Sequence, residues 1–489
     1  MLPVVLVTVL LASDRASAKT CSSLSSLTLP AATITAAEPR TTGSFPHVTG
    51  ADLPGFCRVT ATLTPTSESD IRIEVWLPLA GWNRKLDVVG NGGWSGSIPY
   101  AALAAALRRG YAAAGTDTGH EGGGGPWMQN REKLIDFGYR AVHETTIAAK
   151  AIAAAFYDAA PRFSYFTGCS GAGRQALMAA QRYPGDFNGI VAGAPSLNAT
   201  GRAAFAMWIA QQLRKEAASF IPPANYPAIH DAVLEACDGQ DGVRDGVVEN
   251  PSRCAFDPRV LACGGEASRA CLTAPQIRAA RAIYEPLVDA STGEAIAPGL
   301  SYGSELGWAT FGGAQPFALG TEMFRYLVFD DPDWDYRSLN VGSDMTRMRR
   351  AEAGVINAMD PDLSAFFARG GKLIHYHGWA DPQIQPLSSV EYYERVVRRM
   401  GGASNVRGNY RLFMVPGMAH CGSGNGTSTF DMVSALERWA EHDEAPASIP
   451  ASRVIDGRVD RTRPLCPYPQ QAAYRGSGDI NDARNFVCR

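Results

Sequence analysis

The serine at position 170 lies in the run Gly168-Cys169-Ser170-Gly171-Ala172-Gly173, between a predicted strand at residues 164–167 and a predicted helix at residues 174–183. A serine hydroxyl is a weak nucleophile, and a sharp strand-to-helix turn projects it toward an activating histidine. Ala172 departs from the G-x-S-x-G pattern of such turns. Ser170 is therefore a candidate nucleophile, and the alternatives are an ordinary glycine-rich loop or an anion-binding turn at a helix N-terminus.

A candidate acid and a candidate base follow this serine in the chain. Asp381 comes shortly after a predicted strand at residues 372–378, and His420 comes after one at residues 411–415. The order Ser, Asp, His is the one in which the α/β-hydrolase fold places its catalytic groups. We expect His420 to take the proton from Ser170 and return it to a leaving alcohol, while Asp381 orients the imidazole and stabilises its charged form.

Ten cysteines, none of them in a C-x-x-C pair, predict disulfides rather than a zinc ribbon. Short loops close most readily, which pairs Cys21 with Cys57, Cys237 with Cys254, Cys263 with Cys271 and Cys466 with Cys488, and leaves Cys169 and Cys421 for each other. The last two residues adjoin Ser170 and His420. Because a disulfide holds its Cα atoms about 4.4–6.8 Å apart, this bond would hold the nucleophile and the base together.

A serine that attacks a carbonyl carbon also needs hydrogen-bond donors for the negative charge that develops on the carbonyl oxygen. The N–H group of Gly171, directly after the nucleophile, fits the first role. For the second role, Gly92 and Gly93 follow a predicted strand at residues 86–89 and lack side chains that would block close approach. The choice between these two glycines stays open, and a plain tight turn is the alternative.

Three other histidines are weaker candidates for chemistry. His375 and His377 lie two residues apart on one predicted strand face, where a buried pair is favoured over two metal ligands. His120 precedes a glycine-rich loop and is interpreted as structural or substrate-lining rather than as the base.

An acidic segment at residues 237–247 predicts a structural calcium site. Ca²⁺ takes six to eight oxygen ligands, and a glycine-interrupted loop with three aspartates can supply carboxylates and carbonyls together. The predicted ligands are Asp238, Asp241, Val243, Asp245 and Val247. The spacing is not that of an EF-hand, and the alternative is a pair of solvated Asp-Gly turns.

The elements that must position these residues alternate between strand and helix from about residue 70, which predicts an α/β fold with a largely parallel sheet. Strands are predicted at residues 71–78, 86–89, 111–115 and 189–192, and helices at 101–109, 139–159 and 389–400. This rhythm is lost between residues 196 and 365, a stretch with four cysteines and many aromatic residues. We interpret residues 196–365 as an inserted lid, and residues 19–195 and 366–489 as the catalytic domain.

Composition narrows the classes of partner. A net charge of −3 and a pI near 6.3 give no electrostatic footprint for nucleic acid or an anionic membrane. The apolar run at residues 2–12, followed by Ala16-Ser17-Ala18, predicts a signal peptide over residues 1–18 and a secreted or periplasmic protein. The run is shorter than the roughly 20 residues that a membrane span needs.

These motifs resemble the tannase and feruloyl esterase family. The resemblance rests on Gly-Cys169-Ser170 with Gly-Arg174-Gln175, on Gly378-Trp379-Ala380-Asp381-Pro382 and on Met418-Ala419-His420-Cys421, and it spans nearly the whole mature chain. It implies an α/β-hydrolase domain with a lid, a disulfide that bridges the triad, and calcium held by the five residues named above. It also implies that an aromatic acid lies under the lid, with which Trp308, Phe311, Phe317 and Phe324 are compatible.

The resulting hypothesis is a secreted serine carboxylesterase that acts on small-molecule aromatic esters, such as plant phenolic esters of the feruloyl type, through an acyl-enzyme. Galloyl esters (a tannase activity) and terephthalate half-esters are alternatives within the class. An alternative of another class is a calcium-stabilised binding protein on an inactive hydrolase scaffold. The oligomeric state is not predicted.

Overall fold

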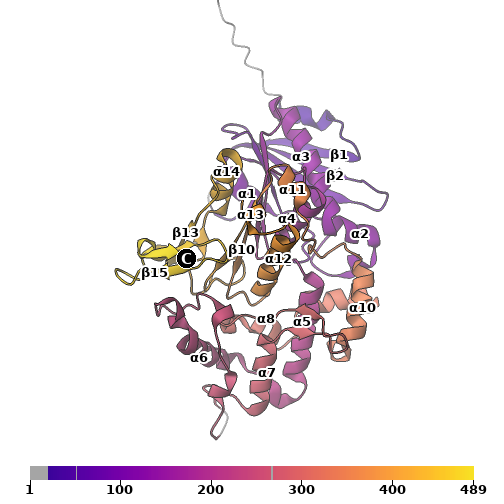
Figure 1. Ribbon diagram of the computed structural model, residues 1–489. Coiled ribbons are helices and arrows are strands. Elements are labelled where there is room, and N and C mark those ends of the chain that lie inside the picture. Colours follow the sequence, from indigo (N-terminus) through magenta and orange to yellow (C-terminus); the bar gives the residue numbers. More distant parts are fainter. Residues whose placement is uncertain (1–19, 51, 266–267) are drawn as a thin grey trace, which may run out of the picture.

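The computed structural model describes residues 20–50, 52–265 and 268–489, so the predicted signal peptide lies outside the described residues. Its centre is a nine-stranded sheet with the strand order β1-β2-β3-β5-β4-β6-β7-β10-β11 (Figure 1). The strands are β1 (Ala32–Arg40), β2 (Phe56–Leu63), β3 (Ile71–Pro78), β4 (Lys85–Val89), β5 (Ala112–Thr116), β6 (Phe163–Cys169), β7 (Gly189–Gly193), β10 (Lys372–Gly378) and β11 (Tyr410–Val415).

The sheet has an antiparallel edge and a parallel body. β1, β2, β3 and β5 pair antiparallel, whereas β5, β4, β6, β7, β10 and β11 pair parallel. All residues of β5 and β7 are buried, as expected for central parallel strands covered on both faces. The predicted α/β fold is confirmed, and β1 and β2 extend the sheet beyond the strands that the sequence predicts.

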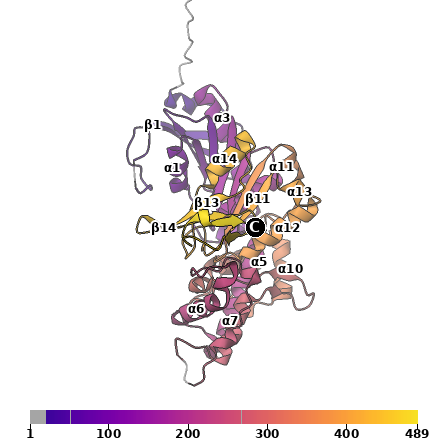
Figure 2. The same ribbon diagram turned by 60° about the vertical axis from the view of Figure 1, so that its left-hand side comes forward.

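Helices cover both faces of this sheet (Figures 1 and 2). On one face, α3 (Ala141–Tyr157), α4 (Gly171–Arg182) and α12 (Pro386–Arg399) share a hydrophobic cluster with the sheet. On the other face, α1 (Tyr100–Arg108) and α14 (Met432–His442) form a second cluster with it. Two short helices, α2 (Arg131–Ile135) and α13 (Ala403–Val406), complete this part of the chain.

Most of the segment between β7 and β10, residues 199–352, forms a helical body with its own hydrophobic cluster and lies below the sheet in Figure 1, whereas residues 364–368 pack against the helices of the sheet. Its described residues add no strand to the nine-stranded sheet. Its elements are α5 (Ala199–Arg214), α6 (Tyr226–Cys237), α7 (Ala274–Tyr284), α8 (Ala309–Gly312), α9 (Ala318–Glu322), α10 (Val341–Glu352), α11 (Ser364–Ala368) and the hairpin of β8 (Leu287–Val288) and β9 (Ala295–Ala297). We call α5 to α10 and this hairpin the lid.

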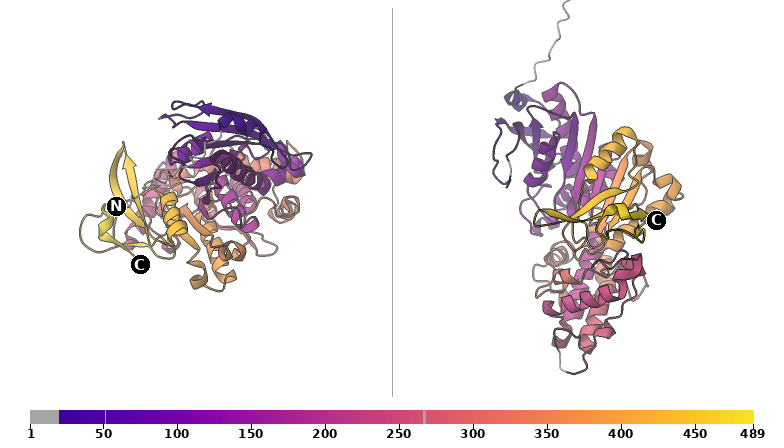
Figure 3. Two further views of the ribbon diagram at one scale, coloured as in Figure 1. Left: turned by 90° about the horizontal axis from the view of Figure 1, so that it is seen from above. Right: turned by 90° about the vertical axis from the view of Figure 1, so that its left-hand side faces the viewer.

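The C-terminal strands lie beside the junction of the sheet and the lid (Figures 2 and 3). They form one small sheet of β12 (Thr429–Phe430), β13 (Ile449–Ile455) and β14 (Arg458–Leu465), and another of β15 (Ala472–Tyr474) and β16 (Phe486–Cys488). Arg463 of β14 reaches the lid segment, where its guanidinium is 2.6 Å from the Asp245 carboxylate. This contact ties the C-terminal strands to the lid.

Five disulfides join the ten cysteines in the predicted pairs: Cys21–Cys57, Cys169–Cys421, Cys237–Cys254, Cys263–Cys271 and Cys466–Cys488. Four of them close loops of 8 to 36 residues, whereas Cys169–Cys421 spans 252 residues. Across the described residues, no helix is both long and apolar enough to cross a membrane.

Candidate active site

Ser170 occupies a strained turn between β6 and α4. Its φ of 67° and ψ of −121° lie in a region that non-glycine residues rarely adopt. Such a conformation costs on the order of 1–3 kcal/mol and persists only where the surroundings fix it. Here the Ser170 N–H donates to the Gly193 carbonyl at 2.9 Å, and the Ser170 carbonyl accepts from the N–H groups of Arg174 and Ser196.

Close packing explains why small residues surround this serine. A Cβ on Gly173 would lie 2.3 Å from the Gly193 carbonyl oxygen, and a Cβ on Gly168 would lie 2.3 Å from the Ala172 methyl group. The same methyl group lies where a Cβ on Gly90 would approach to 2.6 Å. Ala172 therefore fits in place of the expected glycine because Gly168 and Gly90 leave room for its methyl group.

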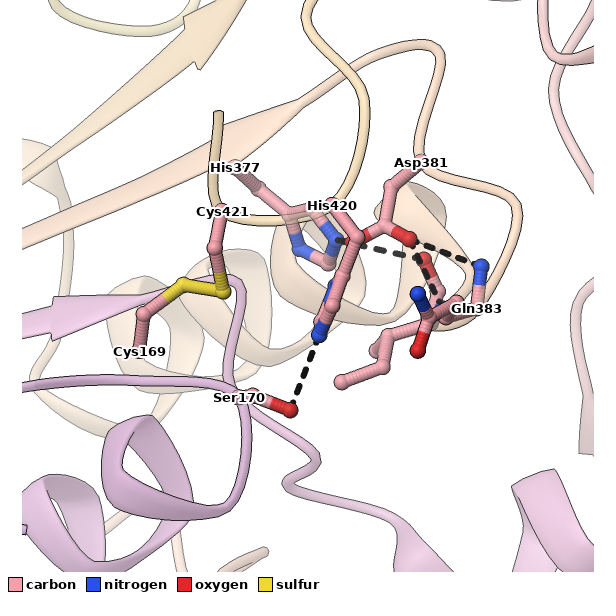
Figure 4. Close-up of a disulfide and its surroundings, with 8 residues drawn as sticks. Cys169, Ser170, His377, Asp381, Gln383, His420 and Cys421 are labelled. Carbon is pink, nitrogen blue, oxygen red and sulfur yellow. Dashed lines mark hydrogen bonds and ion pairs between the residues drawn. A yellow bond between two sulfur atoms is a disulfide. The ribbon is translucent and has the colours of Figure 1, made fainter. Parts of the chain in front are cut away.

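Ser170, His420 and Asp381 form one hydrogen-bonded chain (Figure 4). The Ser170 Oγ lies 2.9 Å from the His420 Nε2, and the His420 Nδ1 lies 2.7 Å from the Asp381 Oδ2. Ser170 and His420 are half-buried, whereas Asp381 is fully buried. The three residues follow β6, β11 and β10, so they meet at the carboxyl edge of the parallel strands, where open α/β sheets bind ligands.

The buried Asp381 carboxylate is held in its charged form. Burial alone would raise its pKa, but the hydrogen bonds that His377 and His420 donate to the carboxylate hold the pKa well below the usual range. The second oxygen, Oδ1, accepts from the N–H groups of Gln383 and Ile384 at 2.8 and 3.0 Å. A fixed, ionised carboxylate is what a base of the His420 type needs behind its ring.

The disulfide between Cys169 and Cys421 links the two halves of this chain. Its Cα atoms are 6.0 Å apart, and its cysteines adjoin Ser170 and His420 (Figure 4). The nucleophile turn and the histidine loop are thus joined covalently next to the reacting groups.

The loop after β4 packs against the nucleophile turn. A Cβ on Gly171 would lie 2.8 Å from the Asn91 carbonyl oxygen and 3.0 Å from the Gly93 nitrogen. Asn91 fixes this loop, since its side-chain amide donates to the carbonyls of Ser97 and Thr116 and its N–H donates to the Gln175 Oε1. The structure therefore brings Gly93 next to Gly171, whereas Gly92 is exposed.

The weaker histidine candidates have structural settings. His375 and His377 are fully buried on β10, as the favoured interpretation expects. His120 is buried, stacks on Trp127 with ring centroids 4.2 Å apart, and bonds through Nε2 to the Trp94 carbonyl at 2.9 Å. Burial lowers the pKa of His120, so its ring is neutral and fixes Trp94 beside the Gly92-Gly93 loop.

The acidic segment is satisfied by protein groups. Asp238 accepts from the N–H groups of Asp245 and Gly246, and Asp245 pairs with Arg461 and Arg463 of β14. Burial and the neighbouring acids raise the pKa of Asp241 to about 6. In the described part of the chain, no three His, Cys, Asp or Glu side chains form a group that could hold a metal ion. Calcium binding by Asp238, Asp241, Val243, Asp245 and Val247 therefore stays a prediction.

Three of the four lid aromatics predicted to line a substrate site form the core of the lid instead. Trp308, Phe311 and Phe324 are at most 1% exposed. Trp308 contacts Tyr226 and Tyr284, Phe311 contacts Phe205, and Phe324 stacks on Trp334, because large apolar rings gain most when neighbouring rings cover them.

Phe317 is half-buried and differs from these three rings. It lies just before α9, where the Leu319 carbonyl accepts from the Trp94 indole at 3.2 Å and the Leu319 side chain faces Gly93. The Arg202 guanidinium lies 5.2 Å from the centre of the Phe317 ring. Arg202 is buried, and burial lowers its pKa to about 10 while the charge of Asp381 opposes that shift. Phe317 is thus the predicted aromatic that lies at the lid edge next to the site.

Sequence reasoning missed three groups that fix the site. His377 lies 3.1 Å from the Asp381 Oδ2 through its Nε2, Gln175 holds the Gly92-Gly93 loop, and Arg174 bonds to carbonyls of residues 137, 138 and 356. Four positions separate His377 from Asp381, but the contact depends on the turn after β10, so the spacing alone does not predict it. The Gln175 and Arg174 contacts depend on loops distant in sequence and give no local signal.

Comparison with known proteins agrees with this geometry. Residues 57–489 match the family described as tannase and feruloyl esterase. The chain is 40% identical to a protein named an uncharacterized esterase from Xanthomonas campestris pv. campestris, over 96% of this chain and 91% of that protein. It is 32% identical to a probable feruloyl esterase B-1 from Aspergillus oryzae, over 88% and 84% of the two chains.

A solved structure shares the whole architecture. The crystal structure of feruloyl esterase B from Aspergillus oryzae has a TM-score of 0.90 and 30% identity, and the match covers 96% of this chain and 99% of that one. The family match, the named relatives and the shared fold all indicate an ester hydrolase. The chain therefore belongs to the tannase and feruloyl esterase family and is a carboxylic ester hydrolase with an α/β-hydrolase fold.

Proposed function

We propose that this protein hydrolyses esters of aromatic, hydroxycinnamoyl-type acids through an acyl-enzyme on Ser170. The observation that carries the mechanism is the hydrogen-bonded chain from the Ser170 Oγ through His420 to Asp381, with distances of 2.9 and 2.7 Å. His420 takes the hydroxyl proton as Oγ attacks the ester carbonyl carbon, and it then gives that proton to the leaving alkoxide. Water, deprotonated by the same imidazole, cleaves the acyl-enzyme and releases the acid.

The oxyanion of each tetrahedral intermediate would accept hydrogen bonds from two backbone N–H groups. Gly171 supplies the first, because it follows the nucleophile and begins α4. We assign the second N–H group to Gly93, because the Gly93 nitrogen lies close to Gly171.

Two observations support an aromatic acyl group. Phe317 has a half-buried ring two residues before Leu319, whose side chain faces Gly93, and an aromatic ring packs favourably against another in an offset or edge-on arrangement. The relatives described above are named probable feruloyl esterase and feruloyl esterase B.

The test is hydrolysis of a panel of methyl ferulate, methyl gallate, a terephthalate half-ester and a short acetate ester by purified protein. We expect methyl ferulate to give the highest kcat/KM. Ser170→Ala should lower kcat on the order of a millionfold, whereas Ser343→Ala, at an exposed serine on α10, should match wild type. Preference for gallate or the half-ester would reassign the substrate. No turnover of any ester by wild type would favour the non-catalytic binding protein.

We further propose export and a structural calcium ion. Five disulfides support export, because disulfides persist in oxidising compartments. The three aspartates Asp238, Asp241 and Asp245 in one glycine-interrupted segment support calcium, because Ca²⁺ prefers oxygen ligands. Calcium takes no part in the proposed reaction.

A further inference from the structure

Two buried histidines of β10 continue the catalytic hydrogen-bond chain into the core. The His377 Nε2 lies 3.1 Å from the Asp381 Oδ2, and the His377 Nδ1 lies 2.7 Å from the Ser389 Oγ. The same hydroxyl lies 2.8 Å from the His375 Nε2, and the His375 Nδ1 lies 2.7 Å from the Tyr410 hydroxyl. All four ring nitrogens therefore have a protein partner, and this uninterrupted series joins Asp381 to a tyrosine of β11.

Burial isolates these groups from solvent. His375, His377, Ser389 and Tyr410 are each 0% exposed, so water cannot replace a missing partner. A buried polar group without a hydrogen bond destabilises the folded state, and a charged one does so more strongly. Each proton position in the series is therefore strongly constrained.

The ionised Asp381 at one end of the series sets the direction of every hydrogen bond. The ionised Asp381 only accepts, so the His377 Nε2 must carry a proton and, in the neutral ring, Nδ1 must accept. Ser389 then donates to the His377 Nδ1, and its oxygen must accept from the His375 Nε2. The remaining nitrogen, the His375 Nδ1, accepts from the Tyr410 hydroxyl.

The electrostatic environment agrees with these assignments. Burial lowers the pKa of His375 well below its usual value, so this ring is neutral. Burial and the neighbouring Tyr392 and Tyr393 raise the pKa of Tyr410 well above its usual value, so its hydroxyl keeps the proton that it donates.

We propose that His377 is a positioning residue for Asp381, and that Ser389, His375 and Tyr410 act as a relay that locks His377 in the tautomer with the proton on Nε2. The proposal rests on the proposed function, because it concerns the same triad. The Asp381 Oδ2 receives two N–H groups, one from His420 and one from His377. His377 thus fixes the rotation of the carboxylate and takes up part of its charge.

Loss of the His377 N–H should have two separable effects. The carboxylate can then turn away from His420, which lowers kcat because the base is less well oriented. The negative charge of the carboxylate is also shared with one donor fewer, so it stabilises the protonated form of His420 more strongly, and the rate should fall off at a higher pH on the acid side of the profile. Other groups that act on Asp381 stay in place: the N–H groups of Gln383 and Ile384, and the charge of Arg202 on α5.

The experiment measures kcat, KM and the pH profile of kcat/KM on methyl ferulate for variants along the relay. His377→Leu should lower kcat about 10- to 100-fold, with KM changed less than about threefold. It should also move the acid limb of the profile, which is the low-pH side where kcat/KM falls, upward by about half a pH unit to one pH unit. His377→Gln keeps a donor near Nε2 and should recover most of both losses. Ser389→Ala and Tyr410→Phe should have successively smaller effects in the same direction, because each lies one or more bonds further from Asp381.

His143→Leu is the matched control. His143 on α3 also bonds to an aspartate, with its Nδ1 2.8 Å from the Asp186 Oδ2, and it stacks on Tyr183. This variant should keep the wild-type kcat and acid limb, even where its melting temperature falls.

The proposal would be overturned if His377→Leu has the same kcat and the same acid limb as His143→Leu. It would also be overturned if folded His377→Gln does not recover activity, or if the effects of the relay variants do not decrease with distance from Asp381. If His377→Leu does not fold, Ser389→Ala and Tyr410→Phe, which remove single oxygens, decide the question alone. Wild type inactive on all esters would contradict the proposed function. An active wild type with relay variants equal to the control would contradict only the relay.

Discussion

Removal of the Cys169–Cys421 disulfide should lower both kcat and the free energy of unfolding. The bond holds Cα atoms 6.0 Å apart, and the Ser170 Oγ and His420 Nε2 next to it are 2.9 Å apart. A relative shift of about 1 Å takes that contact beyond hydrogen-bond range and can lower the rate on the order of 100-fold. We therefore expect Cys169→Ala with Cys421→Ala to lower kcat about 10- to 100-fold and to leave KM nearly unchanged.

The stability effect follows from the loop that the bond closes. Chain entropy for a sequence separation of 252 residues corresponds to about 5.5 kcal/mol, against about 2.5 kcal/mol for the 8-residue separation of Cys263–Cys271. The double variant Cys263→Ala with Cys271→Ala is thus a matched control that loses one disulfide in the lid. It should melt closer to wild type and keep the wild-type kcat.

The assay compares kcat on methyl ferulate and urea unfolding for wild type and both double variants. The kcat values must be taken at a temperature where each protein is folded, so that a loss of rate reports geometry rather than unfolding. Equal kcat for the two double variants would refute the argument that the Cys169–Cys421 bond positions the base. A loss of stability without a loss of rate would leave the bond only a structural role.

Three further predictions test other parts of the structure. Asp87 is buried beside Thr167, and burial raises its pKa to about 8. The folded state then keeps a proton that the unfolded state releases above its lower pKa, so the free energy of unfolding falls as pH rises from about 4 to about 8. In urea unfolding, Asp87→Asn should therefore have a free energy of unfolding on the order of 5 kcal/mol above that of wild type at pH 8.5, and one close to wild type at pH 4. Phe317→Ala should lower kcat/KM for methyl ferulate about 10-fold more than kcat/KM for a short acetate ester. As a control, Phe324→Ala should lower the free energy of unfolding by about 3–5 kcal/mol and leave the ratio of the two kcat/KM values unchanged. Equal ratios in the two variants would show that Phe317 does not contact the substrate. Chelation should lower the melting temperature and added calcium should restore it, since an ion bound only to the native state stabilises that state; an unshifted melting curve would contradict the calcium site.

The sequence predicts the parts of this fold whose signals are local. The strands over residues 372–378 and 71–78 are both found with their predicted bounds. Apolar side chains fill most positions of the second strand, and in the first they are Leu373, Ile374 and Tyr376. β1 is missed because only one face of it is covered: its residues alternate between half-buried and exposed, and alanine and threonine dominate it. An edge strand of this kind lacks the continuous apolar run of a central parallel strand.

The lid aromatics show a limit of composition. Phe311 and Phe317 are six residues apart and have the same side chain, yet one is 1% exposed and the other half-buried. Which ring faces a substrate depends on how α8 and α9 pack on α5, and that packing joins residues about a hundred positions apart. Asp245 shows the same limit, because its arginine partners come from β14, over 200 residues later. Charge partners so distant leave no pattern beside the acidic segment.

Ser170 and His420 could be placed together from the sequence because the predicted disulfide between their neighbours limits the distance between them. Ser170 and His420 are 250 residues apart, and no periodicity relates them, but their neighbours are the two cysteines that the short-loop pairs leave over. His377 had no such marker: its contact with Asp381 depends on the backbone after β10 turning back on itself, and its proton depends on Ser389 and, through His375, on Tyr410. Sequence thus identifies the groups that react, while the groups that fix their protons become visible only when the strands are packed together.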